Sequence, residues 1–406
     1  MKLLFLTQVL PYPLDAGPKI RAYYVLKYLA KQFDITLLSM TRSEDHIDSI
    51  QHLEEFCERV IPVPITRSIF NNILDYTRSF FSGNSFLIMR DFHKDFVRIF
   101  FQLLENNDYD AIHADQLWMA QYALMSSSIY QNSYKPPKIV LDQHNAVYLI
   151  PERLALNNSN PLYKYFLLRE SRMLAQYEIE TCKQFNSVIW VTKEDYQSIS
   201  NLINKNGVSG FERTGVNHII PICIEPDNYM STIPAVDDPN IIFIGGMHWP
   251  PNKEGVVWFI NNVFPIIIDK YPELKIFFVG KNPPEDLLNL QNVNFPGYVE
   301  DIEPFWALGR VFIVPLLSGG GMRVKILEAW AKGIPVVSTS IGAEGIRYTK
   351  SENIIIADTP QEFAEGILAV LKNLELAQRL SVSGRESVEN YYDWKKTYRK
   401  WDNIYP

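Results

Sequence analysis

Apolar and polar positions follow two recurring patterns along this chain. Short apolar runs rich in β-branched residues predict strands, and longer stretches with helical periodicity predict helices. The predicted strands span residues 2–7, 35–39, 59–62, 111–113, 138–142, 187–191, 218–221, 240–244, 275–279, 293–295, 311–314, 336–338 and 353–356. Helical patterns such as 19–31, 91–104 and 255–271 lie between them. Strands that alternate with helices indicate an α/β protein with doubly wound parallel sheets, built from right-handed βαβ units.

The same order of strand, proline- and glycine-containing turn, and helix occurs at the N-terminus and again from residue 240. The two copies share architecture and not sequence, so we predict two Rossmann-like domains. Residues 226–239 contain three prolines and several acids without periodicity, which is typical of a linker. We therefore predict one domain at 1–230, a second at 231–385 and a C-terminal segment at 386–406. Sheets of this kind bind ligands outside the carboxyl ends of their strands, so we expect the domains to face each other across a cleft.

Composition narrows the possible classes of protein. The chain has 406 residues, of which 47% are hydrophobic and 21% charged, an ordinary globular composition with room for two domains. The net charge of −7 is spread over both halves, which argues against a nucleic-acid binder. Three scattered cysteines without CxxC spacing argue against a disulfide framework or a zinc site.

The apolar stretches are too short for a membrane span, and the first of them stops at Gln8, too soon for a signal peptide. We expect a reduced, cytoplasmic protein.

The most informative segment is residues 315–338, which reads as strand, glycine loop, helix and strand. The loop contains three consecutive glycines, Gly319, Gly320 and Gly321. Backbone N–H groups at the start of the following helix form an anion site, and Arg323 and Lys325 add positive charge. Glu328 lies one turn beyond Lys325 and offers a carboxylate to a sugar diol. Together these groups suggest the diphosphate and ribose of a nucleotide.

A plainer interpretation also fits this segment. Lys325, Glu328 and Lys332 share one helical face, so they are equally compatible with a solvated surface and one weak ion pair. The glycines alone are compatible with a tight turn. The spacing differs from the G-x-G-x-x-G dinucleotide fingerprint, whose acidic residue lies well beyond the first helix.

The residues from Gly320 onward, GGMRVKILEAWAKGIPVVST, resemble the donor-nucleotide motif of the GT-B glycosyltransferases of family 4, the glycosyl transferases group 1. The segment FIGGMHWPPN from Phe243 resembles the first turn of that family's C-terminal domain. The segments FVGK, GYVEDI and IGAEGI follow in the family's order, and PYPLDAGPKIR near the N-terminus is similar to its glycine-containing loop. The resemblance spans nearly the whole chain and is strongest in the C-terminal half.

The resemblance implies a GT-B fold and a retaining hexosyl- or glycosyltransferase. Such an enzyme moves a sugar from a nucleotide-sugar donor to a glycan or a lipid-linked acceptor, without a cofactor or a bound metal. It further implies work in surface polysaccharide or lipopolysaccharide synthesis, in the cytoplasm or at the inner face of the membrane. The base, the sugar, the acceptor, the linkage and the oligomeric state are left open.

Carried over by position, Glu328 binds the donor ribose, and the three glycines with Arg323 and Lys325 bind the diphosphate. Arg323 and Lys325 then also stabilise the leaving group. The remaining donor-binding positions implied by the family pattern are Gly17, Gly245, Gly246 and Lys281.

Two departures from the family pattern matter. The family's E-x7-E pair requires an acid at position 320, where this chain has Gly320. The family's common Arg and Lys in the turn after Phe243 fall on Gly246 and Asn252. We expect Arg323 and Lys325 to supply the missing positive charge, with Asn252 as an additional contact. The loss of the acid leaves the level of activity open.

His144 follows the predicted strand at 138–142, and family members have a histidine there that touches the transferred sugar. We therefore assign His144 a catalytic role, although a lone histidine at this place is also compatible with a structural one. His113 ends another strand and is a weaker candidate. Asp108 and Asp110 spell a D-x-D motif, which holds a metal in another glycosyltransferase fold. Here the motif precedes a strand and lies away from the cleft, so we predict no metal site.

Residues 67–104 mix basic and aromatic side chains. The basic residues are Arg67, Arg78, Arg90, Lys94 and Arg98, and Arg153, Lys164, Arg169 and Arg172 extend the set. Phe92, Phe96, Ile99, Phe100 and Leu103 share one helical face. Packing into the core is the first interpretation of that stripe, and contact with an anionic membrane that carries a lipid-linked acceptor is the second. The aromatic and basic C-terminal segment suits the family's last helix, which packs back on the first domain.

Two other functions stay open. A nucleotide-sugar epimerase on the same fold requires acid and base groups on both sides of the sugar, and few are present. A GT-B scaffold that binds a nucleotide-sugar or glycan without turnover fits the missing acid at Gly320. Glu328, Arg323 and His144 together favour the transferase.

Overall fold

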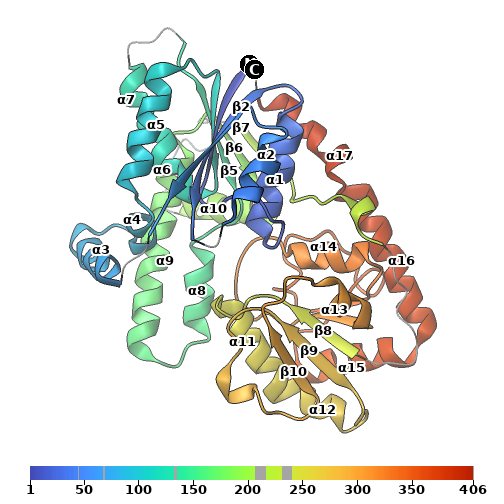
Figure 1. The fold of residues 1–406 in the computed structure, drawn as a ribbon. Helices are drawn as coiled ribbons and strands as arrows, with labels where there is room; N and C mark the ends of the chain where they lie inside the picture. Colours follow the sequence, from blue (N-terminus) through green and yellow to red (C-terminus); the bar gives the residue numbers. More distant parts are fainter. Residues whose placement is uncertain (44, 67–68, 132–134, 206–215, 231–239, 406) are drawn as a thin grey trace. The chain divides into compact units, whose positions relative to one another are not determined.

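The computed structural model describes residues 1–43, 45–66, 69–131, 135–205, 216–230 and 240–405 (Figure 1). Two compact units emerge from the contacts within the chain. Unit 1 comprises residues 1–223 and 397–406, and unit 2 comprises residues 224–396. No helix in the described part of the chain is both long enough and apolar enough to span a bilayer.

Unit 1 contains a seven-stranded, all-parallel sheet in the order β3-β2-β1-β4-β5-β6-β7. The strands are β1 (Lys2–Thr7), β2 (Asp34–Thr41), β3 (Arg59–Pro64), β4 (Ala111–Asp115), β5 (Lys138–Gln143), β6 (Ser187–Trp190) and β7 (Val216–Ile219). Helices cover both faces of the sheet, with α1 and α2 on one side and α5 and α6 on the other (Figure 1).

The helices of unit 1 are α1 (Gly17–Leu29), α2 (Ile47–Glu54), α3 (Ile69–Ser82), α4 (Phe86–Arg90), α5 (Lys94–Asn106), α6 (Leu117–Met125), α7 (Ser127–Tyr130), α8 (Leu149–Leu156), α9 (Pro161–Cys182) and α10 (Lys193–Lys205). The side chains of Phe96, Phe100 and Leu103 on α5 are buried in the core. The prediction that this aromatic stripe packs into the core is therefore confirmed for α5, whereas Phe92 precedes the helix and is exposed.

Unit 2 contains a six-stranded, all-parallel sheet in the order β10-β9-β8-β11-β12-β13. The strands are β8 (Asn240–Ile244), β9 (Lys275–Val279), β10 (Val293–Gly297), β11 (Val311–Val314), β12 (Val336–Ser338) and β13 (Ile355–Ile356). The helices are α11 (Pro250–Trp258), α12 (Phe264–Ile268), α13 (Glu303–Leu308), α14 (Val324–Ala331), α15 (Pro360–Lys372), α16 (Leu374–Tyr391) and α17 (Trp394–Thr397). Both sheets have the strand order of the doubly wound Rossmann fold.

Every predicted strand is present, and most differences are confined to a residue or two at the ends. The single helix predicted over 255–271 is wrong in detail. A π-helical turn, Phe259–Val263, separates α11 from α12. Pro265 has no N–H to donate to the preceding turn, so the regular α-helical hydrogen bonding is interrupted there.

The unit boundaries fall at Cys223 and Thr397, where the sequence placed them at 230 and 386. Residues 386–391 complete α16, whose Ser387 hydroxyl accepts a hydrogen bond from the Asn353 side chain within unit 2. The predicted linker 226–239 begins with a short 3₁₀ turn, Pro226–Asn228, and its residues 231–239 lie outside the described residues.

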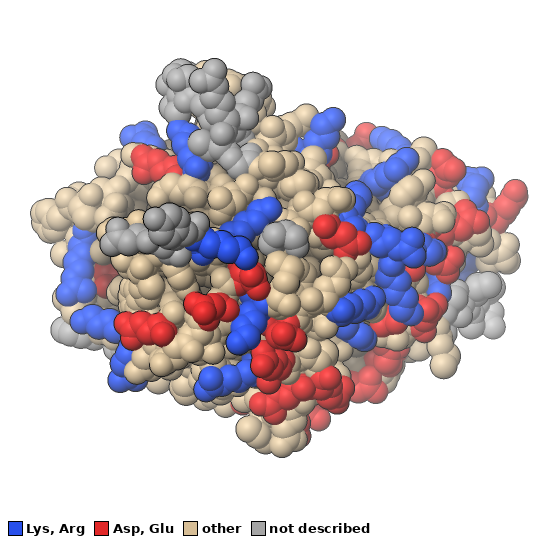
Figure 2. Space-filling model, turned by 90° about the horizontal axis from the view of Figure 1, so that it is seen from above, with Lys and Arg blue, Asp and Glu red and all other residues tan. Residues whose placement is uncertain are grey.

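Beyond residue 397, the last segment packs into unit 1. Tyr398, Trp401, Ile404 and Tyr405 are buried there. The three cysteines are buried and free, which confirms that they form no disulfide. Acidic and basic side chains are mixed over the face shown in Figure 2.

Candidate functional site

In unit 2, the strand order reverses between β8 and β11, which lie side by side. Their carboxyl ends lead into two loops, residues 245–249 and residues 315–323. A crevice at such a switch point is the usual ligand site of a doubly wound sheet. The tertiary structure therefore brings together two sequence motifs that lie about seventy residues apart.

The glycine loop is shaped around Arg323. Its Nη1 donates hydrogen bonds to the carbonyl oxygens of Gly320 and Gly321, at 2.5 and 2.8 Å. Gly319 and Gly321 have φ angles of +115° and +75°, which favour glycine. A Cβ at Gly319 would lie 2.5 Å from Nη2 of Arg323, so a side chain there would displace the guanidinium. The glycines thus permit the close approach of an arginine to the loop.

Arg323 is also the N-cap residue of α14 and does not cap the helix with its side chain. Its guanidinium lies 5.3 Å from the ring centroid of Trp249, which belongs to the loop after β8. This cation–π contact joins the two loops of the switch point. The N–H groups of the first turn of α14 and the Arg323 guanidinium together form a positive end that suits a diphosphate.

The helix that follows does not present a solvated polar face. Glu328 is only 4% exposed and Lys332 is 3% exposed. The Lys325 Nζ lies 2.6 Å from Oε2 of Glu328, and the Lys332 Nζ lies 2.5 Å from a carboxylate oxygen of Glu303. The interpretation of this segment as a solvated surface is therefore wrong. The Glu328 carboxylate is buried, whereas its partner Lys325 is 25% exposed. Because a buried charge without a partner is costly, this pairing indicates a polar site built into the structure.

In the loop after β8, the Nδ2 of Asn252 donates to the carbonyl oxygen of Gly246 at 3.0 Å. Asn252 therefore fixes the turn. The loop is also tied to the segment after β9, because the Met247 N–H donates to the carbonyl oxygen of Lys281 at 2.8 Å. The Nζ of Lys281 lies 4.5 Å from the ring centroid of Tyr298.

Gly245 belongs to the same turn, and its neighbour Gly280 packs against it. Gly280 has a φ of +157°, and a Cβ there would lie 2.1 Å from the carbonyl oxygen of Gly245. Two β-strand ends therefore meet at backbone distance beside the glycine loop.

Three residues of this site were not singled out from the sequence. Trp249 packs on Arg323, and the Ser318 hydroxyl donates to Oε2 of Glu254 at 2.5 Å. Ser318 is fully buried beside the glycines, so Glu254 braces the loop from α11. Trp249 stands inside the quoted family segment, but nothing in its spacing indicated a partner seventy residues away.

In unit 1, the candidate His144 follows β5. Its Nε2 lies 2.9 Å from Oδ1 of Asp115, which ends β4. His144 is 8% exposed and Asp115 is fully buried. Burial raises the pKa of the Asp115 carboxyl, although the neighbouring His144 acts in the opposite direction. The pair resembles the carboxylate–imidazole arrangement that fixes the orientation and tautomer of a histidine.

His113 lies in the core of unit 1 and is fully buried. Its ring stacks on Phe5 with centroids 4.0 Å apart, and its Nδ1 lies 2.5 Å from the hydroxyl of Tyr405. These contacts enclose the His113 ring in the core of unit 1, so they favour a structural role over a catalytic one. Gly17 is the first residue of α1, at the carboxyl side of β1.

Arg21 and Asp142 form a fully buried ion pair beside these histidines, with N–O distances of 2.9 and 3.0 Å. Burial raises the pKa of Asp142, but the Arg21 guanidinium together with His144 and His113 holds the pKa below the usual range. His113, Asp115 and Asp142 place one ligand atom each within 4.8 Å of one another. Arg21 already donates to both carboxylate oxygens of Asp142, so the guanidinium supplies the positive charge that balances this carboxylate.

The D-x-D motif lies at the other edge of the sheet. Asp110 precedes β4, and its Oδ2 accepts a hydrogen bond from the N–H of Lys2, at the start of β1. The prediction that this motif lies away from the strands' carboxyl ends is confirmed.

Comparisons with known proteins agree with this geometry. Residues 238–373 match the family described as Glycosyl transferases group 1. The chain is 23% identical to an uncharacterized 44.6 kDa protein in the cps region of Klebsiella pneumoniae, over 98% of each chain. It is 34% identical to the lipopolysaccharide core biosynthesis glycosyltransferase LpsE of Rhizobium meliloti, over 24% of this chain and 28% of LpsE.

A similar solved structure is that of HepE from Anabaena in complex with UDP-glucose. It has a TM-score of 0.66 and 14% identity, and the match covers 100% of this chain and 99% of HepE. At this level of identity the similarity concerns the fold alone, the GT-B fold with its two Rossmann-like units.

Proposed function

We propose that this chain, whose residues 238–373 match the Glycosyl transferases group 1 family, transfers a sugar from a nucleotide-sugar donor to a glycan or lipid-linked acceptor, with retention of anomeric configuration. One observation carries the proposal. The Arg323 guanidinium closes the glycine loop at the switch point of unit 2 and lies over Trp249, beside the uncapped first turn of α14.

In this proposal, the first-turn amides of α14 and Arg323 bind the donor diphosphate and stabilise it as the leaving group. Lys325 assists from the same helix. Glu328 accepts hydrogen bonds from the ribose diol while its charge remains balanced by Lys325. Loss of a charged hydrogen-bond partner costs about 1.5–3 kcal/mol, which corresponds to a nucleotide complex weaker by about 10- to 150-fold.

Unit 1 contributes His144, which we propose contacts the transferred sugar. Asp115 holds the imidazole through Nε2, so Nδ1 is the ring atom available to the substrate. The acceptor hydroxyl attacks from the face that the diphosphate leaves, and a donor phosphate oxygen takes its proton. No side chain is assigned as a covalent nucleophile.

The acceptor class follows from the relatives. One is encoded in a cps region and another acts in lipopolysaccharide core biosynthesis. We therefore propose a role in the synthesis of a surface polysaccharide or lipopolysaccharide. The HepE complex makes UDP-glucose the first donor to test.

The test is thermal stability against UDP, GDP, ADP and their sugars, for the wild type and for Glu328→Gln. We expect one nucleotide to raise the melting temperature of the wild type, and we expect Glu328→Gln to bind that nucleotide at least tenfold more weakly. Glu375→Gln, an exposed acid on α16 of the same unit, is the matched control and keeps wild-type binding. Absence of a shift with every nucleotide would contradict the proposal.

A scaffold that binds without turnover has one observation in its favour, the glycine at position 320 in place of an acid. Donor turnover separates the two functions. A transferase releases nucleoside diphosphate in proportion to the glycosylated acceptor, an epimerase converts the donor sugar, and a scaffold does neither. The anomeric configuration of the product, read from its NMR coupling constants, tests retention.

A further inference from the structure

Helix α3 of unit 1 turns its apolar side outward. Ile73, Tyr76, Phe80 and Phe81 are all exposed, and we call them the α3 apolar face. Phe81 is 82% exposed and Ile73 is 60% exposed. Amphipathic helices of globular domains normally turn this side toward the core. An exposed concentration of large apolar side chains on one helix marks a surface that contacts something else.

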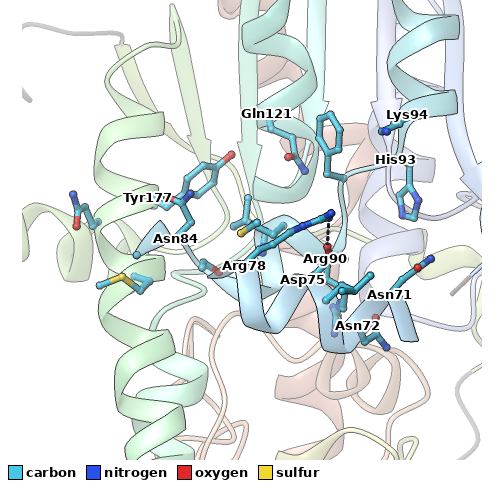
Figure 3. Close-up of a pocket in the computed structure, with 18 of the residues that line it drawn as sticks. Asn71, Asn72, Asp75, Arg78, Asn84, Arg90, His93, Lys94, Gln121 and Tyr177 are labelled. Atoms are coloured by element: carbon cyan, nitrogen blue, oxygen red, sulfur yellow. Dashed lines mark hydrogen bonds and ion pairs between the residues drawn. The ribbon is translucent and has the colours of Figure 1, made fainter. Parts of the chain in front are cut away.

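The opposite side of α3 is polar and lines a pocket of about 690 Å³. Asn71, Asp75 and Arg78 contribute from α3, at the spacing of one helical face. Figure 3 shows these side chains together with Arg90, His93 and Lys94, which lie in and beside α4 and at the start of α5. Gln121 of α6 and Tyr177 of α9 complete the wall. All of these residues belong to unit 1, so the pocket is complete within one unit.

Cations outnumber carboxylates in the lining of this pocket. Arg78, Arg90 and Lys94 face Asp75 and Glu180 among its lining residues. The cations make two long ion pairs in the described structure: Nη1 of Arg78 lies 3.5 Å from Oδ1 of Asp75, and Nη2 of Arg90 lies 3.3 Å from Oδ2 of the neighbouring Asp91. The Nε of Arg90 is buried and has no hydrogen-bond partner within the described part of the chain. A ligand with anionic oxygens satisfies such a donor set.

The helix is held against α9 by specific contacts. The rings of Tyr76 and Phe166 lie 5.6 Å apart. The Arg169 guanidinium lies 5.7 Å from the ring of Phe80 and donates to the carbonyl oxygen of Ser79 at 2.6 Å. The α3 apolar face is therefore a built surface with a fixed orientation, and the same contacts fix the pocket behind it.

We propose that α3 lies in the interface of an anionic phospholipid bilayer and that the pocket on its polar side receives the phosphate of a lipid head group. The α3 apolar face inserts at the boundary between head groups and acyl chains, as expected for an interfacial helix. The pocket cations, with Lys164 and the exposed Arg172 on α9, are attracted by the negative surface of the bilayer. An anionic amphiphile is the one occupant that matches both the apolar face and the cationic pocket. Arg67, which the sequence grouped with these cations, lies outside the described residues.

This proposal depends on neither the donor nor catalysis, so it is tested without nucleotide. The first experiment is co-sedimentation of the protein with vesicles of phosphatidylcholine and phosphatidylglycerol at 3:1, and with phosphatidylcholine alone. We expect the wild type to bind the anionic vesicles at least tenfold more tightly. The double variant Ile73→Ser/Phe81→Ser should lose at least tenfold in binding, because both side chains are exposed and make the largest apolar contribution.

Matched controls separate this effect from general surface changes. Leu374→Ser/Val382→Ser removes two exposed apolar side chains from α16 and should bind vesicles like the wild type. In the second experiment, Arg78→Gln/Lys94→Gln should lose the preference for anionic over neutral vesicles. Arg399→Gln/Lys400→Gln makes the same change of charge at two exposed positions after α17 and should keep the preference. Far-ultraviolet circular dichroism and the melting temperature verify that each variant folds.

Three results would overturn the proposal. The wild type binds neutral and anionic vesicles equally, or Ile73→Ser/Phe81→Ser binds as tightly as the wild type. The third result is a wild type that is a dimer in sedimentation equilibrium and does not bind vesicles, with a double variant that is a monomer. The α3 apolar face would then be an interface between two copies of the chain. Failure here leaves the nucleotide-binding experiment on Glu328 unaffected, because the two sites belong to different units.

Discussion

Burial of His113 predicts a specific loss of stability in acid. The ring is fully buried between Phe5 and the C-terminal segment, where its Nδ1 meets the hydroxyl of Tyr405. Burial lowers the pKa of His113 to about 3; the charge of Asp142 opposes this shift, and that of Arg21 adds to it. In the unfolded chain the same imidazole has a pKa of about 6.5.

Because the pKa of His113 is lower in the folded state, there is a pH range between about 3 and about 6.5 in which the unfolded chain binds a proton at this imidazole and the folded protein does not. Stability is therefore unaffected above about pH 6.5, decreases as the pH falls, and reaches its full loss near pH 3. The slope approaches about 1.4 kcal/mol per pH unit, so the loss between pH 7 and pH 5 is about 2 kcal/mol.

The variant His113→Gln removes the titrating group and keeps a side chain able to hydrogen-bond to Tyr405. We expect it to be less stable than the wild type at pH 7, because it loses the stacking on Phe5. Between pH 7 and pH 5, however, it should lose about 2 kcal/mol less than the wild type. Urea unfolding at pH 7, 6 and 5 measures this difference, with hydrogen exchange of peptides from β4 assigning the transition to unit 1.

The matched control is His46→Gln, at an exposed position before α2, which should keep the wild-type dependence on pH. Parallel stability curves for the wild type and His113→Gln would refute the reasoning. In that event, His113 is either protonated in the folded state or accessible to water.

Three further predictions follow from buried contacts. Arg21→Met leaves the Asp142 carboxylate buried without its partner and should lower the free energy of unfolding of unit 1 in urea by about 3–5 kcal/mol. The double variant Arg21→Met/Asp142→Asn should restore most of this loss, and equal stability of the single and double variants would contradict the prediction. Gly280→Ala forces a Cβ against the carbonyl oxygen of Gly245 and should lower both the melting temperature of unit 2 and its affinity for nucleotide, whereas an unchanged affinity would separate this turn from the site. Thr359→Ala removes the capping box of α15 and should cost about 1 kcal/mol in calorimetry, while Thr359→Ser should recover most of it.

The sequence determined the elements of both units. Parallel strands buried on both faces are continuous apolar runs, so their positions can be predicted from one sequence. The strands β1, β8, β9, β11 and β12 have the predicted bounds. The alternation of strands with helices then restricts the fold to doubly wound sheets. The glycine loop and Arg323 were also predicted as a candidate anion site from the sequence, because three consecutive glycines precede a helical pattern that begins with basic residues.

Tertiary structure decided between the two interpretations of α14, a solvated helix surface and a polar binding site. Spacing alone places Lys325 and Glu328 on one helical face, but burial depends on what packs against that face. The structure buries Glu328 and pairs it with Lys325. Likewise, Trp249 became a partner of Arg323 only when the strand order placed β8 beside β11.

In unit 1, His113 and His144 both follow or end predicted strands in the sequence, and only the tertiary structure distinguished them. His113 is enclosed by Phe5 and the C-terminal segment, whereas His144 keeps slight exposure and a buried carboxylate partner in Asp115. The same holds for α3, because its exposed apolar residues were seen to face outward only in the tertiary structure. Local periodicity specifies what a segment forms, and only contacts between residues distant in sequence specify what each side chain faces.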